Sequence, residues 1–184
     1  LTFFEYCSAF EGTEEEAWKE YITYGGLPLT LLQSNDEQKS SYLSSLFETT
    51  YLKDIIERNN VQRKEVLDSL VNVLSSAIGS LTNPAKIANT FKSNAIQDVS
   101  VNTIDTYIGY LLDAFLIEKV ERYDVKGKKY ISTPSKYYFS DIGLRNAKLN
   151  FRQQEENHLM ENIIYNELLA RGYNVDVGVV GIRE

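Results

Sequence analysis

The sequence comprises 184 residues with a formal net charge of −7; 43% of the residues are hydrophobic and 24% are charged. A chain of this length can fold as one compact domain or two small ones around a buried core. Its single cysteine, Cys7, excludes an internal disulfide bond, and together with the single histidine, His158, it excludes a zinc site made of cysteines and histidines. Apolar runs are only a few residues long and no secretory signal is present, so we expect a cytoplasmic protein without a membrane segment.

Charge is distributed unevenly along the chain. Residues 1–60 carry 4 basic and 11 acidic side chains, residues 61–148 carry 12 basic and 9 acidic ones, and residues 149–184 carry 3 basic and 6 acidic ones. A protein that coats nucleic acid regardless of its sequence needs clustered lysine and arginine to neutralise phosphates. The overall acidity argues against that class of protein, and only the middle of the chain is locally basic.

The first sixty residues predict two helices. Thr13 and Glu16 form a capping box, in which the threonine oxygen accepts a backbone N–H and the glutamate reaches back to the cap. The helix that follows ends at Gly25. Ser34 and Glu37 form a second capping box, and the helix that they open is expected to run to about residue 58. Its apolar stripe consists of Leu43, Leu46, Phe47, Thr50 and Tyr51.

Three helices are predicted in the next segment. The first extends over residues 64–79. Asn83 followed by Pro84 is an N-cap with proline at the first helical position, which predicts a short second helix. A turn is expected over residues 92–99, after which Ser100 caps the third helix. The expected buried face of this third helix consists of Ile104, Ile108, Leu111, Leu112 and Phe115.

Strands follow the third helix. Residues 117–125 and 128–132 are predicted as two strands joined by a tight turn at residues 126–127, and residues 136–140 as a further short strand. Three helices followed by a two-stranded hairpin are typical of a winged helix-turn-helix. The last of the three helices then occupies the recognition position, and the hairpin tip is the wing.

The remaining residues predict a different kind of unit. Asp141 caps a small helix that extends to residue 149, and a strongly apolar helix then stops at Gly172. Residues 173–182 alternate like a strand. One helix and one strand cannot complete a sheet, so we expect the start of an α/β domain and a chain excised from a longer protein.

Five blocks of sequence carry a resemblance to a known family. They are residues 1–6 (LTFFEY), 24–28 (YGGLP), 51–55 (YLKDI), 136–146 (KYYFSDIGLRN) and 158–168 (HLMENIIYNEL). In this order they resemble prokaryotic AAA-type P-loop ATPases with a C-terminal domain of unknown function. The similar region is the part that follows the ATPase core, and the blocks extend over nearly the whole chain.

The resemblance implies a mainly α fold with a small β component in three parts. Residues 1–60 are expected to form a helical lid or connector, residues 61–149 the winged helix-turn-helix, and residues 150–184 the first helix and strand of an incomplete α/β domain similar to a PD-(D/E)xK nuclease. It also implies an N-terminal ATPase core as the partner of this region within the parent protein. ATP and magnesium are expected for that parent only.

Nucleotide binding by this chain itself is not expected. A phosphate-binding loop needs several glycines followed by lysine and serine or threonine, so that backbone N–H groups and the lysine grip the phosphates. The Gly-Lys pair of this sequence, Gly127 with Lys128, is followed by Lys129 and lies in the predicted hairpin. We therefore predict no catalytic residue and no cofactor in this chain.

If the winged helix contacts DNA, the candidates are polar residues of the recognition-position helix and lysines around the wing. These are Asn102, Thr103, Thr106, Lys126, Lys128, Lys129 and Lys136. Asparagine and threonine can bond to base edges, and lysines neutralise phosphates. Asp105 and Asp113 lie on the same helix and oppose phosphates, so a winged helix that docks a protein partner is an alternative.

Glu161 matches the first-helix acid of PD-(D/E)xK-like domains, in which several carboxylates hold a divalent metal that activates water. Without partner acids it is not expected to hold a metal, and an ordinary polar position on a helix face is the alternative. The sequence leaves three functions open. The main prediction is a non-catalytic regulatory and binding region of an AAA-type ATPase; the alternatives are part of a nuclease-related enzyme domain and a protein-docking module.

Overall fold

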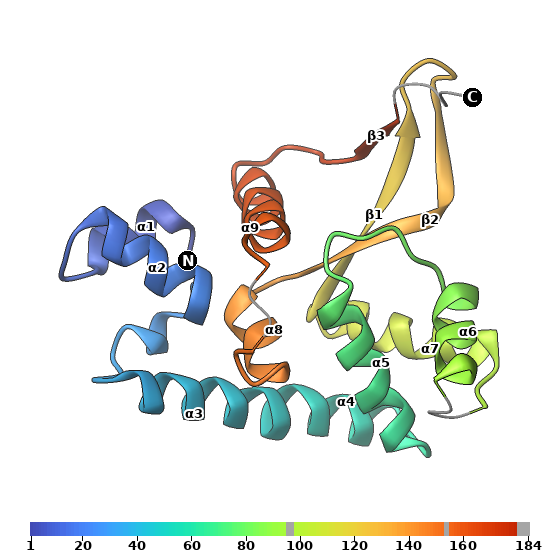
Figure 1. Cartoon of the computed structure of the whole chain (residues 1–184), viewed down its shortest axis with the longest axis horizontal. Helices are drawn as coiled ribbons and strands as arrows, with labels where there is room; N and C mark the ends of the chain where they lie inside the picture. The colour runs from blue at the N-terminus through green and yellow to red at the C-terminus, as the bar shows by residue number, and fades with distance from the viewer. Residues whose placement is uncertain (95–97, 153–154, 180–184) are drawn as a thin grey trace.

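The computed structural model describes residues 1–94, 98–152 and 155–179 (Figure 1). The protein is mainly helical with a small three-stranded sheet, as the sequence predicted. The described helices are α1 (Phe3–Ala9), α2 (Glu14–Tyr24), η1 (Pro28–Thr30), α3 (Asp36–Leu46), η2 (Phe47–Leu52), α4 (Lys53–Arg58), α5 (Lys64–Ser76), α6 (Pro84–Ser93), α7 (Val101–Asp113), α8 (Ile142–Lys148) and α9 (Glu156–Ala170). The described strands are β1 (Ile117–Asp124), β2 (Lys129–Phe139) and β3 (Val177–Val179).

Helix α1 was not predicted from the sequence. It begins with a capping box of its own, in which the Thr2 N–H donates to the Glu5 carboxylate at 2.8 Å and the Glu5 N–H donates to the Thr2 hydroxyl at 3.3 Å. The helix packs on α2 through an edge-to-face pair of Phe3 and Trp18, whose ring centroids are 5.1 Å apart. The predicted capping box of α2 is confirmed.

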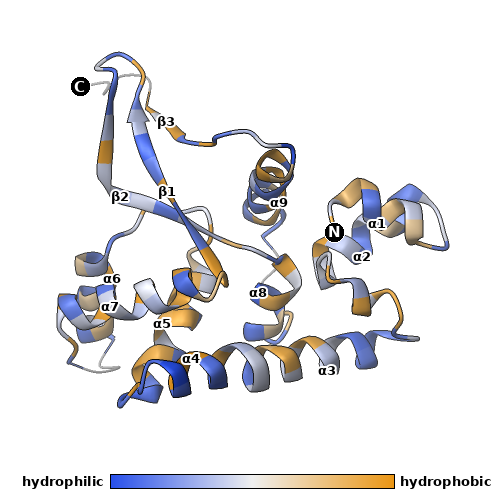
Figure 2. Ribbon diagram, turned by 180° about the vertical axis from the view of Figure 1, so that it is seen from behind, coloured by the Kyte–Doolittle hydropathy of each residue, from blue (hydrophilic) through white to orange (hydrophobic). Residues whose placement is uncertain are grey.

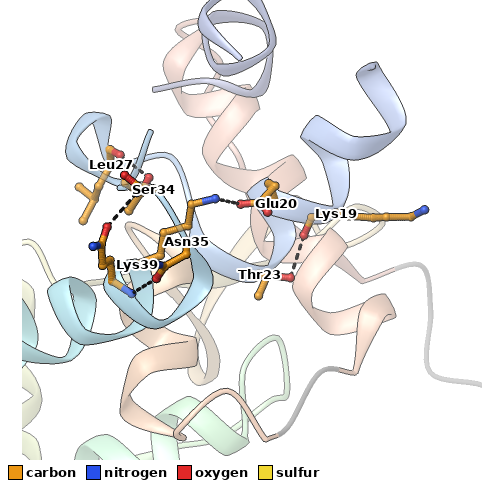
Figure 3. Close-up of polar contacts among 9 residues, drawn as sticks. Lys19, Glu20, Thr23, Leu27, Ser34, Asn35 and Lys39 are labelled. Atoms are coloured by element: carbon orange, nitrogen blue, oxygen red, sulfur yellow. Dashed lines mark hydrogen bonds and ion pairs between the residues drawn. The ribbon is translucent and has the colours of Figure 1, made fainter. Parts of the chain in front are cut away.

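The helix predicted from Ser34 begins one residue later than expected. Asn35 has an extended backbone and its side-chain oxygen accepts the Gln38 N–H at 2.9 Å, so Asn35 is the cap (Figure 3). Ser34 instead donates its own N–H to the Gln38 side chain. An ion pair between Lys39 and Glu20, 2.5 Å long, joins α3 to α2. α3, the π-helical η2 and α4 then form one rod that ends where the sequence predicted.

Helices α5, α6 and α7 begin and end close to the predicted positions, and the caps Asn83 and Ser100 are confirmed. Most of the predicted inner face of α7 is buried, whereas Leu112 is half-buried. The prediction for Phe115 is wrong: 73% of this residue is exposed. Helix α7 ends at Asp113 and Phe115 adopts a φ of +53°, so the chain turns away from the helical face there, and Leu116 is buried instead.

β1 and β2 form a long antiparallel hairpin. The two strands that the sequence predicted over residues 128–132 and 136–140 are parts of a single β2, whose register against β1 shifts between Val120 and Arg122. Within the extra residues of β2, Ser135 exchanges two backbone hydrogen bonds of 2.9 Å with Thr82, which lies between α5 and α6. These bonds attach the hairpin to the helices before it.

β3 pairs in parallel with β1, which gives the strand order β2-β1-β3. This strand was expected to begin a separate sheet, whereas in the structure it lies at the edge of the hairpin. Residues 180–182 of the predicted strand lie outside the described residues. A second, small apolar cluster of Val120, Tyr138 and Tyr165 fills the space between the hairpin and α9.

One hydrophobic core extends through all three predicted segments. Tyr6, Leu70 and Ile163, which come from the first, second and third segment, belong to the same buried cluster. Helix α8 lies between them, where the Asn146 side chain donates to the Ile22 carbonyl at 2.9 Å. Over the described ranges, no helix combines the length and apolar character needed to cross a bilayer.

Candidate nucleic-acid interface

The tip of the β1–β2 hairpin is a tight turn built by Asp124. Its carboxylate accepts the N–H groups of Lys126 and Gly127 at 3.1 and 3.0 Å. A Cβ atom on Gly127 would overlap that carboxylate, which explains the glycine at this position. Lys128 has a φ of +49°. The Gly-Lys pair is therefore part of a hairpin turn, as the sequence predicted.

Three lysines surround this turn. Lys126, Lys128 and Lys129 are exposed, and none of them forms an ion pair with any residue that the structure describes. The hairpin extends well beyond the helices that surround its base (Figure 1). Tyr130 is 60% exposed beside them. The tip thus offers three lysines without an ion pair, arranged around the Asp124 carboxylate, and an aromatic surface at the end of a projecting element.

Acidic residues lie beside the same tip. The Tyr130 hydroxyl donates to Asp176 at 3.1 Å, and Lys119 forms a 3.5 Å ion pair with Glu121. Asp176 directly precedes β3, so its place beside the hairpin follows from the pairing of β3 with β1. Sequence reasoning missed both Tyr130 and Asp176, because nothing in their sequence neighbourhood indicates this long-range pairing. The carboxylates of Asp176 and Glu121 reduce the local positive potential.

Helix α7, which the sequence predicted in the recognition position, presents fewer polar candidates than expected. Asn102 and Thr106 are exposed, as expected. Thr103 is half-buried, and its N–H and hydroxyl both bond to Ser100 at the start of the helix. Asp105 is exposed between the candidates and repels phosphates. Helix α7 contains no lysine or arginine, so it adds no positive charge to the interface.

Lys136 lies at the base of the hairpin, apart from the tip lysines. Its ammonium group is 2.5 Å from Glu161 Oε1, and the same oxygen accepts the Tyr138 hydroxyl. The Lys136 side chain is 20% exposed. The structure thus brings together two candidates that the sequence treated separately, one for DNA and one for nuclease chemistry, in a contact between β2 and α9.

Glu161 is the centre of this polar cluster. Burial by itself raises the pKa of its carboxyl group, but the hydrogen bonds from Lys136 and Tyr138 and the nearby charges of Lys136 and His158 outweigh that effect and lower the pKa below its usual range. A Cβ atom on Gly79 would come within 3.2 Å of the carboxylate. Among the described residues, no three histidines, cysteines or acids are close enough to hold a metal ion.

Asp141 joins the N-terminal helices to the rest of the protein. Its carboxylate accepts the N–H groups of Gly143 and Leu144 at the start of α8 and that of Gly26 at 2.8 Å. Burial raises the pKa of Asp141, although the three N–H groups favour its ionised form. The sequence identified Asp141 as a helix cap, but its bond to Gly26, more than a hundred residues away, has no local signal.

Comparison with known proteins identifies the family. Residues 15–155 match the family described as a domain of unknown function, DUF8612, and the chain belongs to that family. An uncharacterized protein of Haemophilus influenzae is 36% identical over 170 residues, which cover 92% of this chain and 42% of the relative. The uncharacterized protein MJ1544 of Methanocaldococcus jannaschii is 28% identical over 154 residues, covering 84% of this chain and 34% of the relative. The chain thus spans less than half the length of these relatives. No solved structure matches it significantly.

Proposed function

We propose that this member of the DUF8612 family is a non-catalytic regulatory region of an AAA-type ATPase that contacts DNA phosphates through the tip of the β1–β2 hairpin. The observation that carries the proposal is the group of three exposed lysines at the tip, Lys126, Lys128 and Lys129. Each lacks an ion-pair partner among the described residues. Unneutralised lysines on a projecting hairpin are suited to contact with a phosphate backbone.

In this proposal α5, α6, α7 and the hairpin form a winged helix-turn-helix. Three helices followed by an antiparallel hairpin have the order of that motif, and the two hydrogen bonds between Thr82 and Ser135 support a fixed attachment of the hairpin to the helices. Helix α7 then faces the groove, where Asn102 and Thr106 can bond to base edges. The hairpin is the wing that follows the backbone.

The charges favour weak binding that depends little on DNA sequence. Asp105 and Asp113 on α7 repel phosphates, and the whole chain carries a net charge of −7. Attraction therefore comes from lysines outside α7, and we assign it to those of the hairpin tip. We expect a dissociation constant in the non-specific range of about 10⁻⁴ to 10⁻⁶ M at physiological salt.

The proposed parent protein contains an ATPase core, which would bind ATP and magnesium and act on this region. Support comes from the five sequence blocks described above, and from relatives more than twice as long as the aligned segment, which leaves room for further domains. The proposed C-terminal nuclease-like half would begin at α9. Because Glu161 is bound by Lys136 and Tyr138, we propose that it has a structural role in this region.

A second candidate function is docking of a protein partner by the same helix–hairpin unit. The exposed aspartates of α7 favour it, because a carboxylate surface suits a basic protein better than a phosphate backbone. Docking through the α7 aspartates does not require the tip lysines, whereas the proposed DNA contact does.

Fluorescence anisotropy with a labelled duplex distinguishes the two. The chain should bind the duplex at low salt, and the triple variant Lys126→Ala, Lys128→Ala, Lys129→Ala should bind at least about tenfold more weakly. The control is the triple variant Lys19→Ala, Lys53→Ala, Lys64→Ala, which also removes three positive charges but from α2, α4 and α5. It should bind like the parent. Equal losses in both triple variants would place the DNA contact away from the tip, and no binding by the parent would favour protein docking.

A further inference from the structure

A groove of about 630 Å³ lies between α1, α2 and α9, away from the hairpin tip. Its walls are largely apolar, with Phe3 and Cys7 from α1, Ala17 and Trp18 from α2, and Ile163 from α9. Figure 2 shows apolar segments on both α1 and α9. The groove differs from the polar surface of the hairpin and takes no part in the proposed DNA contact.

Large apolar side chains are exposed along the rim of this groove. Phe4 on α1 is 77% exposed, and Ile164 on α9 is 52% exposed. Met160 lies four residues before Ile164 on α9 and is 41% exposed, so it extends the same stripe by one helical turn. Scattered exposed apolar residues are common, but exposed apolar side chains on two facing walls of a groove are typical of an interaction surface.

The dimensions suit a helix. The residues that border the groove and its extension run along α9 from Met160 to the C-cap Arg171, which corresponds to about 16 Å along the helix axis. That length matches about three turns of a second helix. A helix that docks in such a groove needs apolar residues at a spacing of three and four along one face.

The charge around the groove indicates which residues the docked helix carries beside its apolar stripe. Gly12, Thr13 and Glu14 line one end of the groove, and the exposed residues Glu11, Glu15 and Glu16 adjoin them in the sequence. Glu15 pairs with Lys19 at 2.7 Å. Arg171 is the basic residue of the lining and pairs with Glu167 at 3.6 Å. An occupant with lysine or arginine beside its apolar stripe would therefore be attracted, and an acidic one repelled.

We propose that the α1–α2–α9 groove is a docking site for a basic amphipathic helix of a protein partner. The apolar stripe of the helix packs between Phe4 and Ile164, and its lysines or arginines face Glu14 and the exposed glutamates that adjoin it in the sequence. This site is separate from the tip lysines, so its test does not depend on whether the protein binds DNA.

Trp18 provides a direct measurement of occupancy, because it lines the groove and is the single tryptophan of the sequence. The probe is a helical peptide of about 14 leucine and lysine residues without aromatic side chains. Its titration should shift the Trp18 emission to shorter wavelength in a saturable way. A peptide with the same leucine spacing and glutamate in place of lysine should bind at least about tenfold more weakly.

Two variants test the position of the site. Phe4→Asp and Ile164→Asp place a charge on the exposed apolar rim and should each weaken peptide binding by about tenfold or more. Leu32→Asp is the matched control, because Leu32 is 74% exposed outside the groove and its variant should bind like the parent. Circular dichroism of all three verifies that the fold is retained.

Three results would overturn the proposal. The first is an unchanged Trp18 emission at saturating peptide, and the second is equal binding of the lysine and glutamate peptides. The third is a Trp18 shift that develops with protein concentration in the absence of peptide, because a second copy of the chain would then be the occupant.

Discussion

A Cβ atom on Gly25 would overlap the carboxylate of Asp141. The two residues belong to segments that are far apart in the sequence, and the φ of Gly25 is +74°, a left-handed conformation that favours glycine. Gly26 continues the contact by donating its N–H to the same carboxylate. This close approach of the turn after α2 to the start of α8 fixes the N-terminal helices on the rest of the protein.

Substitution of Gly25 tests this joint. Gly25→Ala should destabilise the protein by about 3 kcal/mol, because it combines a left-handed alanine with displacement of Asp141. Gly172→Ala is the matched control: Gly172 has a φ of +81° but no neighbour within 4 Å of its added Cβ, so about 1 kcal/mol is expected. Urea unfolding measures both, and equal losses would show that the close approach contributes nothing.

The inner face of α7 makes a second prediction. Leu111 is fully buried, so Leu111→Ala should lower the free energy of unfolding by about 2–5 kcal/mol. Phe115 lies two residues after the helix and is 73% exposed, so Phe115→Ala should change the free energy of unfolding by about 0.5 kcal/mol or less. Thermal unfolding of the two variants compares them, and a larger loss for Phe115→Ala would contradict the assigned face.

Glu161 predicts a pH dependence of stability. Its folded pKa lies below its usual value, because the hydrogen bonds from Lys136 and Tyr138 outweigh burial. The ionised Glu161 carboxylate therefore stabilises the folded protein fully at pH values above its pKa in the unfolded chain, about 4.3. This stabilisation is lost as the pH falls through the pKa of Glu161 in the folded protein. The parent should be more stable than Glu161→Gln at neutral pH, and the difference should shrink as the pH falls below about 4.

Unfolding by urea at several pH values measures this difference. Glu48→Gln is the matched control, because Glu48 is an exposed glutamate on the helical rod. A constant gap between parent and Glu161→Gln down to pH values near 3 would mean that the carboxylate is not the group responsible.

The tip lysines predict a salt dependence. If each of Lys126, Lys128 and Lys129 neutralises one phosphate, the logarithm of the binding constant should fall with the logarithm of salt concentration at a slope of about −2.7. Each single alanine variant should reduce the steepness by about 0.9. Anisotropy titrations across a salt series provide the slope, and an unchanged slope in all three variants would place the contact elsewhere.

The absence of a phosphate-binding sequence predicts the behaviour with nucleotide. The Gly-Lys pair at the hairpin tip lacks the serine or threonine and the preceding glycines of a P-loop. Calorimetric titration of the chain with ATP and magnesium should therefore detect no binding in the micromolar range. A micromolar dissociation constant would contradict this prediction.

The sequence by itself determined most of the local structure. Thr13, Asn83, Ser100 and Asp141 were identified as caps, because a short polar side chain that bonds to the first turn acts within a few residues. The periodicity of α7 indicated most of its buried residues, because apolar spacing along one helix is also a local signal. Where such local signals compete, they fail: Ser34 and Asn35 are both good caps, and Phe115 continues the apolar spacing of α7 beyond the residue at which the helix ends.

Only the tertiary structure decided which distant groups meet. The pairing of β3 with β1, which places Asp176 beside Tyr130, depends on the path of the chain through α8 and α9 and has no short-range signal. The same holds for Lys136 and Glu161, whose ion pair forms because β2 and α9 pack against each other. The groove bordered by Phe4 and Ile164 likewise exists only once α1 and α9 are brought together. Hydrogen bonds within a turn can be predicted from neighbouring residues, whereas contacts between distant segments depend on how the whole core packs.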